Sequence, residues 1–200
     1  MSMYPFPPAP DLACNETNWA YWNKAFTDEE INKIIEIGET HYKLETAGTG
    51  RDINSVNNPE IRSSKVSWIP LNGDTQWIYD RIRDIIVPLN GQYFQFDLFG
   101  FVEHLQYTVY GEKDSHYTWH QDKGIIRSSP RKLSVVIQLS DPSEYDGGNL
   151  QFMIGNEPET ARKEKGMLYT FPSWVLHRVT PVTQGIRRTL VIWLSGPKFK

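Results

Sequence analysis

Short apolar or alternating segments, separated by turn-forming residues, fill the chain from about residue 94 onward and constrain its fold more than any other feature. Typical separators are Asp146-Gly147-Gly148 and Pro172-Ser173. Many short strands at regular spacing are typical of a β-sandwich or barrel, and we expect a jelly roll. The expected strands are 65–69, 94–101, 105–110, 117–122, 133–139, 148–153, 167–171, 175–179 and 187–194.

Two helices are expected before most of these strands. Thr27 and Glu30 have the spacing of a capping box, in which the threonine caps the helix and the glutamate reaches back to it. Isoleucines then recur at helical spacing, and the pattern predicts a helix over 28–41. A second amphipathic segment predicts a helix over 75–87, with Pro88 near its end. The expected fold is therefore mainly β, with a jelly-roll core packed by N-terminal helices.

Length, charge and cysteine content limit the classes of protein. A chain of 200 residues suits one domain, 1–200, with a proline-rich irregular arm over 1–18. The net charge of -3 gives no basic footprint for nucleic acid. The single cysteine excludes an internal disulfide and fits a reducing cytoplasm. We see neither a signal peptide nor a membrane span, so we expect a cytoplasmic protein without a membrane partner.

Two polar segments are candidates for a lid over the site. Residues 45–63 are rich in Gly, Asn, Ser and Thr and read as a long loop. Residues 111–116 are polar and directly precede the first candidate ligands. A plain surface excursion explains the first segment equally well.

Three side chains are candidate metal ligands. His120 and Asp122 are two residues apart, so on an extended strand both point to the same face. His177 lies on a later strand that a jelly roll brings back beside the first. Two histidines and one carboxylate leave three coordination positions open, which is typical of non-haem Fe(II) oxygenases. A His-x-Asp pair alone more often lies in a surface turn, so the pair needs further support.

Arg187 supports a metal site because its position suggests a second binding group nearby. It begins an otherwise apolar strand ten residues after His177. A buried cation needs an anionic partner, and a guanidinium can hold a carboxylate through two hydrogen bonds. Thr189 lies on the same strand face and adds a hydroxyl donor. The pocket would therefore suit a short dicarboxylate keto acid, although a salt bridge to a protein carboxylate is the simpler alternative.

Taken together, these residues resemble the Fe(II)- and 2-oxoglutarate-dependent dioxygenases, and within them the prolyl 4-hydroxylase-like group. The resemblance covers roughly residues 60–196, which would form the catalytic core. It implies a double-stranded β-helix, the cupin-like form of the jelly roll. The matching segments are Gln106–Tyr110, Tyr117–Asp122, Arg131–Leu139, Gly147–Leu150, Gly166–Pro172 and His177–Val182.

The resemblance also implies roles for individual residues. His120, Asp122 and His177 would hold the iron, and Arg187 the distal carboxylate of 2-oxoglutarate. Many collagen-type members have a lysine at the position of Arg187, so this chain departs from that subgroup. Tyr110 matches a tyrosine whose hydroxyl reaches the co-substrate, and Tyr117 matches one that lines the pocket; core packing is the alternative for both. Trp119 and Trp174, beside the ligands, are candidates for the substrate pocket.

The activity implied is hydroxylation of a C–H bond, coupled to decarboxylation of 2-oxoglutarate to succinate. Fe(II), 2-oxoglutarate and O2 would be required, and ascorbate is a further candidate. A carboxylate ligand at Asp122 occupies the position that a halide would need, which favours hydroxylation over halogenation. The expected substrate is a prolyl residue in a peptide or protein, and the alternative is a free amino acid or another small molecule.

Readings outside hydroxylation are weaker. The branch that repairs nucleic acid carries a second arginine six residues after the first, where this chain has Trp193. A non-catalytic cupin-like binding module or a zinc hydrolase could use the same three ligands. Zinc would satisfy the ligands but would leave Arg187 unexplained. The oligomeric state has no signature in the sequence.

Overall fold

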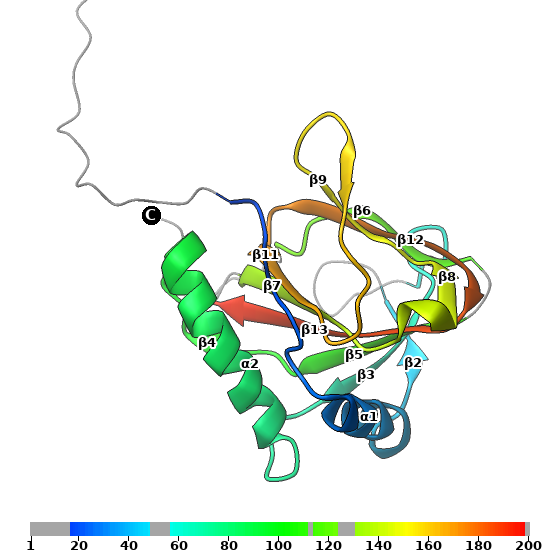
Figure 1. The fold of residues 1–200 in the computed structure, drawn as a ribbon, viewed down its shortest axis with the longest axis horizontal. Helices are drawn as coiled ribbons and strands as arrows, with labels where there is room; N and C mark the ends of the chain where they lie inside the picture. Colours follow the sequence, from blue (N-terminus) through cyan, green and yellow to red (C-terminus); the bar gives the residue numbers. More distant parts are fainter. Residues whose placement is uncertain (1–16, 49–56, 112–113, 124–130, 199–200) are drawn as a thin grey trace, which may run out of the picture.

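A computed structural model describes residues 17–48, 57–111, 114–123 and 131–198 of the chain. Its strands form two antiparallel sheets stacked as two layers, and both helices lie on the outer side of the larger sheet (Figure 1). This arrangement confirms the mainly β class and the position of the helices outside the core.

The larger sheet has eight strands in the order β1-β11-β7-β13-β5-β3-β2, with β4 paired to β13. Its central strands, β7, β13 and β5, come from distant parts of the chain and therefore bring distant residues side by side. The eight strands are β1 (Ala20–Trp22), β2 (Glu45–Thr46), β3 (Lys65–Ile69), β4 (Gly100–Phe101), β5 (Leu105–Tyr110), β7 (Arg131–Gln138), β11 (Leu168–Pro172) and β13 (Arg187–Ser195).

The smaller sheet has five strands in the order β10-β9-β12-β6, and β8 also pairs with β12. A short 3-10 helix, Pro142–Glu144, leads into β8. In Figure 1 this sheet forms the layer farther from the helices. Its strands are β6 (Ser115–His120), β8 (Tyr145–Gly147), β9 (Leu150–Met153), β10 (Pro158–Thr160) and β12 (Leu176–Gly185).

The first helix begins as the sequence predicts. Thr27 accepts a hydrogen bond from the Glu30 backbone, and the Glu30 side chain accepts one from Thr27. α1 (Asp28–Glu36) continues as a π-helical turn, Ile37–His41, so the predicted end is also correct. Gly38 is there for a packing reason, since a Cβ at this position would lie 2.4 Å from Cγ of Tyr107.

The second helix runs farther than predicted. α2 (Gln76–Leu89) contains Pro88 and continues as a π-helical turn, Asn90–Phe94. Proline removes one backbone donor, but buried apolar side chains on both sides of it keep the segment on the sheet. The expected strand over 94–101 is consequently wrong except for β4. The helical segment ends only at Phe94, and the backbone of Gln95 is left-handed.

The two faces of the larger sheet differ sharply in chemistry. On one face, alternate residues of the central strands pack with both helices in a continuous apolar core. The other face, here called the inner face, points toward the smaller sheet and is largely polar along its middle. Inner-face residues of β5, β7 and β13 are Gln106, Thr108, Tyr110, Lys132, Ser134, Val136, Gln138, Arg187, Thr189, Val191 and Trp193.

Apolar side chains join the two sheets beside this polar strip. Val136 and Phe171 of the larger sheet pack with Phe152 of the smaller one, and the Phe152 and Phe171 ring centroids are 4.9 Å apart. Tyr110, Val179 and Val182 form a second, smaller contact. The space between the sheets is therefore closed by apolar contacts and lined by polar groups where the candidate ligands lie.

The remaining sequence predictions concern short strands and the two lid candidates. The sequence did not predict β1, β2, β8 and β10, since each has only two or three residues, and the expected turn at Asp146-Gly147-Gly148 lies partly in β8. The lid candidate 111–116 enters β6 at Ser115, and 45–63 begins with β2; residues 49–56 and 112–113 lie outside the described residues. Within the described ranges, no helix is long and apolar enough to cross a membrane.

Candidate active site

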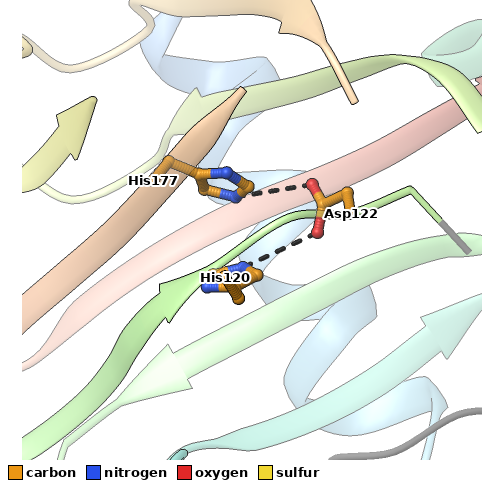
Figure 2. A group of neighbouring side chains, drawn as sticks. All are labelled: His120, Asp122 and His177. Carbon is orange, nitrogen blue, oxygen red and sulfur yellow. Dashed lines mark ion pairs between the residues drawn. The ribbon is translucent and has the colours of Figure 1, made fainter. Parts of the chain in front are cut away.

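The three candidate ligands meet between the sheets (Figure 2). His120 is the last residue of β6, and His177 lies directly opposite it on β12. Asp122 lies two residues past the end of β6, so the expected strand over 117–122 is too long. Figure 2 shows the Asp122 carboxylate beside both imidazole rings, with a dashed line to each ring, and the two histidines come from neighbouring strands.

The hydrogen bonds of the histidines turn one nitrogen of each ring toward the carboxylate. Nδ1 of His120 lies 2.7 Å from the Thr118 carbonyl, and Nδ1 of His177 lies 2.9 Å from the Val175 carbonyl. Because a carbonyl only accepts, each Nδ1 carries the proton and each neutral ring presents Nε2 as a lone pair. Those Nε2 atoms lie 3.6 Å and 3.4 Å from the carboxylate oxygens of Asp122.

The surroundings of His120 and Asp122 favour the protonation states that bind a metal, a neutral imidazole and an ionised carboxylate. Burial and the neighbouring His177 lower the pKa of His120 to about 3, so its ring is neutral at physiological pH. Burial alone would raise the pKa of Asp122, but the two histidines, Arg131 and the Ser134 hydroxyl hold it at about 2. Two imidazoles and one carboxylate, with ligand atoms within 4.8 Å of one another, fit a divalent transition metal.

Residues outside the triad hold Asp122 in position. Ser134 on β7 donates a hydrogen bond of 2.7 Å to Oδ2 of Asp122 and lies 3.0 Å from the Ser173 hydroxyl. Arg131 pairs with Glu103, and its guanidinium lies 3.7 Å from the ring centroid of Trp193. Such contacts orient a ligand and tune a metal.

Arg187 is the largest fully buried side chain among the described residues, with 1% of its surface exposed. Its Nη2 donates to Gln138 Oε1 at 3.1 Å, and its Cζ lies 5.3 Å from the Tyr110 ring centroid. Nε has no hydrogen-bond partner, and no ion pair joins Arg187 to a carboxylate in the described ranges. The salt-bridge alternative therefore finds no support in this part of the chain.

A glycine makes room for this arginine. Gly148 has a φ of +57°, and a Cβ there would lie 2.8 Å from Cδ of Arg187. Across the same region the Tyr145 hydroxyl is buried without a hydrogen-bond partner. A buried cation beside unpaired donors is an environment that suits an anion.

The other predicted co-substrate residues lie near Arg187. Tyr110 is paired with Arg187 across β5 and β13 and is 3% exposed. Thr189 is buried two residues along β13 on the same face. Tyr117 lies on the histidine side, where its ring stacks on His120 with centroids 3.5 Å apart. Burial raises the pKa of Tyr117 to about 12, so its hydroxyl stays protonated.

The two tryptophan candidates lie in different surroundings. Trp119 precedes His120 on β6, so its side chain points to the opposite face of the smaller sheet, where Arg178 stacks on it at 4.5 Å. This location argues against a place in the pocket. Trp174 lies in the turn before His177, is 39% exposed and packs on Phe96 with ring centroids 5.4 Å apart. Only Trp174 is exposed near the ligands.

The sequence reasoning missed Ser134, Gln138 and Gly148. A signal for the first two was present, because polar residues at alternate positions of the apolar strand β7 must share one face. Gly148 carried no comparable signal, since a glycine pair after an aspartate reads as an ordinary turn.

Comparison with known proteins finds similarity over part of the chain. The model of the 2OG-Fe(II) oxygenase superfamily matches residues 105–195, which hold all three candidate ligands and Arg187. A relative that matches part of the chain is a PKHD-type hydroxylase of Synechococcus sp. (strain CC9902), 36% identical over 80 residues. The match covers 40% of this chain and 36% of that protein, well under half of the relative's length.

Solved structures show the same fold over nearly the whole chain. A prolyl-4-hydroxylase of Pseudomonas putida superimposes with a TM-score of 0.70 at 17% identity, covering 90% of this chain and 94% of that one. A prolyl hydroxylase of Trichoplax adhaerens, solved with a peptide fragment of hypoxia inducible factor, gives 0.68 at 17% identity, covering 88% and 83%. The predicted double-stranded β-helix fold is thereby confirmed.

Proposed function

We propose that the protein is an Fe(II)- and 2-oxoglutarate-dependent hydroxylase that acts on prolyl residues of a peptide or protein. The observation that carries the proposal is Arg187, a buried arginine without a carboxylate partner in the described ranges, on the face that also holds the candidate ligands. A zinc hydrolase or a binding module would need only the triad. Residues 60–196 form the catalytic core in this proposal, and the cytoplasmic location stays a prediction.

His120, Asp122 and His177 would hold the iron. Their Nε2 and carboxylate atoms converge from one side, because all three come from the smaller sheet and the loop after β6. Three ligands on one side leave the other coordination positions open for co-substrates. When bound, iron with 2-oxoglutarate and O2 supplies the oxidising power that converts a C–H bond to C–OH, and the protein contributes binding and orientation.

Arg187 would bind the distal carboxylate of 2-oxoglutarate. Its Nε has no partner in the described residues, and the Gln138 amide oxygen holds Nη2 so that the guanidinium keeps one orientation. Tyr110 and Thr189, on the same inner face, would add hydroxyl donors. Neutral donors around a fixed cation favour a dicarboxylate over a monocarboxylate keto acid.

The prolyl substrate is proposed from the relatives and from the pocket. The structural relatives described above are a prolyl-4-hydroxylase and a prolyl hydroxylase with a bound peptide. Here Tyr117, stacked on His120, lies beside the ligands, and the exposed Trp174 lies at the rim. Aromatic walls suit the flat apolar ring of proline.

Mass spectrometry of proline-containing peptides after turnover tests this function. The purified protein receives Fe(II), 2-oxoglutarate, O2 and ascorbate, which keeps the iron reduced. We expect a gain of one oxygen on proline and an equal amount of succinate, and neither with Asp122→Asn. Product only on free proline or another small molecule would overturn the peptide substrate, and absence of succinate under every condition would overturn the hydroxylase.

A further inference from the structure

A second buried arginine reaches the site from the opposite side to Arg187. Arg62 lies before β3 and forms an isolated bridge with Tyr117 on β6. Its guanidinium lies 4.7 Å from the Tyr117 ring centroid, and that ring stacks on His120 at 3.5 Å. Arg62, Tyr117 and His120 therefore form a continuous stack that ends at the candidate metal ligands.

The polar contacts of Arg62 are all to neutral groups. Nε donates to the Ser64 hydroxyl at 2.9 Å, and Nη2 donates to Gln106 Oε1 at 2.9 Å. The same Gln106 oxygen also accepts a bond from Thr108 at 3.3 Å, so it is fully used. In the described ranges no carboxylate pairs with Arg62, and its Nη1 donates to none of these residues.

A buried arginine without a carboxylate partner is unusual in this molecule. Arg131 is paired with Glu103 and Arg188 with Glu39, although both are more exposed than Arg62 at 7%. Arg62 and Arg187 are both buried, and in the described ranges neither pairs with a carboxylate. Burying a guanidinium without a counter-charge is unfavourable, so such a residue is expected to meet an anion during function.

The two arginines are held at different positions along β5. Arg62 is anchored at Gln106 and Arg187 is paired with Tyr110, four residues farther along β5. At the rise of an extended strand these anchor points are about 13 Å apart. Arg187 already has the distal carboxylate of the co-substrate in the function proposed above, which leaves Arg62 for the substrate.

We propose that Arg62 binds a carboxylate of the substrate close to the C–H bond that is hydroxylated. The proposal rests on the hydroxylase reaction proposed above and specifies that its substrate carries a carboxylate, either on an acidic residue beside the target in a peptide or on a free amino acid. The carboxylate would meet Nη1 of Arg62, while the Tyr117 ring packs between this charge and His120. Arg62 is thus a residue that determines substrate specificity.

Binding of matched acids and amides tests the proposal. The probes are acetylated, amidated tetrapeptides with Glu or Gln directly before or after proline, together with L-proline and L-prolinamide. Tryptophan fluorescence of protein loaded with 2-oxoglutarate and Zn(II) in place of iron measures affinity without turnover. One charge-assisted hydrogen bond corresponds to about 10-fold to 100-fold in affinity, and we expect wild type to prefer the acids by that factor. The peptide and proline pairs show which source of carboxylate is used.

Three variants separate recognition from structure. Arg62→Gln should abolish the preference for acids and leave the affinity for 2-oxoglutarate unchanged, and Arg62→Lys should retain part of the preference if packing tolerates it. Arg178→Gln is the matched control, because Arg178 also stacks on an aromatic ring and bonds a glutamine, but on the outer face. It should keep the full preference. Thermal unfolding checks that each variant is folded.

Each remaining outcome counts against the proposal in a defined way. No preference for acids in wild type, or an undiminished preference in Arg62→Gln, overturns the role of Arg62. A parallel loss of 2-oxoglutarate affinity in Arg62→Gln assigns the residue to the co-substrate and also overturns it. Wild type that never forms succinate refutes the proposed hydroxylase itself, whereas succinate formation without an acid preference refutes the substrate inference alone.

Discussion

The helix-facing and inner faces of strand β13 lie on one backbone but have opposite chemistry. Leu190, Ile192 and Leu194 pack with the helices in the main apolar core. Arg187, Thr189 and Trp193 face the smaller sheet, where buried polar side chains and the candidate ligands lie. Arg188, on the helix-facing side, is paired with Glu39, while its neighbour Arg187 has no carboxylate in the described ranges.

This difference separates stability from chemistry. Burial of apolar area on the helix-facing side is the main source of folding free energy. The inner face carries buried polar and charged groups, which cost free energy unless they are paired. We infer that the first face stabilises the sheet strongly enough for the second to hold unpaired donors ready for metal and anions. Substitutions on the two faces should therefore have different consequences.

The largest effect is expected on the inner face, for Asp122→Asn. The amide keeps the size of the side chain but removes the negative charge and turns an acceptor into a donor toward one histidine. Activity should fall by at least about 10³-fold, which corresponds to about 4 kcal/mol in the barrier. Succinate formation measures activity, and circular dichroism checks the fold. Substantial activity in this variant would show that Asp122 is not an iron ligand.

The helix-facing side should respond in stability instead. Ile192 is 1% exposed, and Ile192→Ala should lower the free energy of unfolding by about 2–5 kcal/mol. Chemical denaturation measures this loss, and metal binding by the folded fraction should be unchanged. Thr189→Val, on the other face of the same strand, is the control and should cost far less. Equal destabilisation by both variants would remove the distinction between the faces.

Acid should destabilise the metal-free protein through its inner face. The pKa of His120 is about 3 in the folded protein, against an ordinary value of 6.5, so the unfolded chain binds the proton first as pH falls. Stability is then lost as pH falls from about 6.5 toward 3, by a few kcal/mol. Asp122, with a folded pKa of about 2 against an ordinary 3.8, adds a further loss below pH 4. Denaturation of chelated protein across this range should show a flatter profile for His120→Gln.

Adjacent arginines on β13 provide the sharpest pair of variants. Arg187→Gln should raise the KM for 2-oxoglutarate by about 10-fold to 100-fold, because the distal carboxylate loses a charge-assisted bond. Arg188→Gln, one residue away on the other face, should leave that KM unchanged and affect only the contact with Glu39. Steady-state kinetics at varied 2-oxoglutarate measures both. The same KM in Arg187→Gln as in wild type would mean that the assignment is wrong.

The smallest effect is expected at the start of α1, far from both faces. Thr27→Ala removes the side chain that accepts the Glu30 backbone bond, and N-cap losses cost about 1 kcal/mol. Thermal denaturation should record a small decrease in Tm with unchanged activity. A change in the KM for any substrate would indicate that the helix layer is coupled to the inner face.

Local rules predicted the parts of this molecule that depend on neighbours in sequence. The capping box at Thr27 and the strand beginning at Arg187 follow from short patterns, and both are present. Alternation alone also placed Arg187 and Arg188 on opposite faces. The ligand set His120, Asp122 and His177 was predicted from spacing and resemblance, and the side chains do come together, while their role stays a proposal.

Long-range packing explains what the sequence could not provide. Helix α2 continues through Pro88 because its apolar side chains are held by the sheet. Asp122 reaches the histidines from a loop, and Ser134 of a distant strand fixes it there. Arg62 reads as an ordinary polar residue at the end of a loop, and only the fold shows that it stacks on Tyr117.

The most direct test of the inner-face site is the joint binding of Fe(II) and 2-oxoglutarate without oxygen. We predict that the two together raise the Tm of the protein more than either alone and produce a weak visible absorption band. Asp122→Asn should lose both signals, and Arg187→Gln should need a higher concentration of 2-oxoglutarate to reach them. Absence of the band and of the stabilisation in wild type, with tight retention of zinc, would contradict the account.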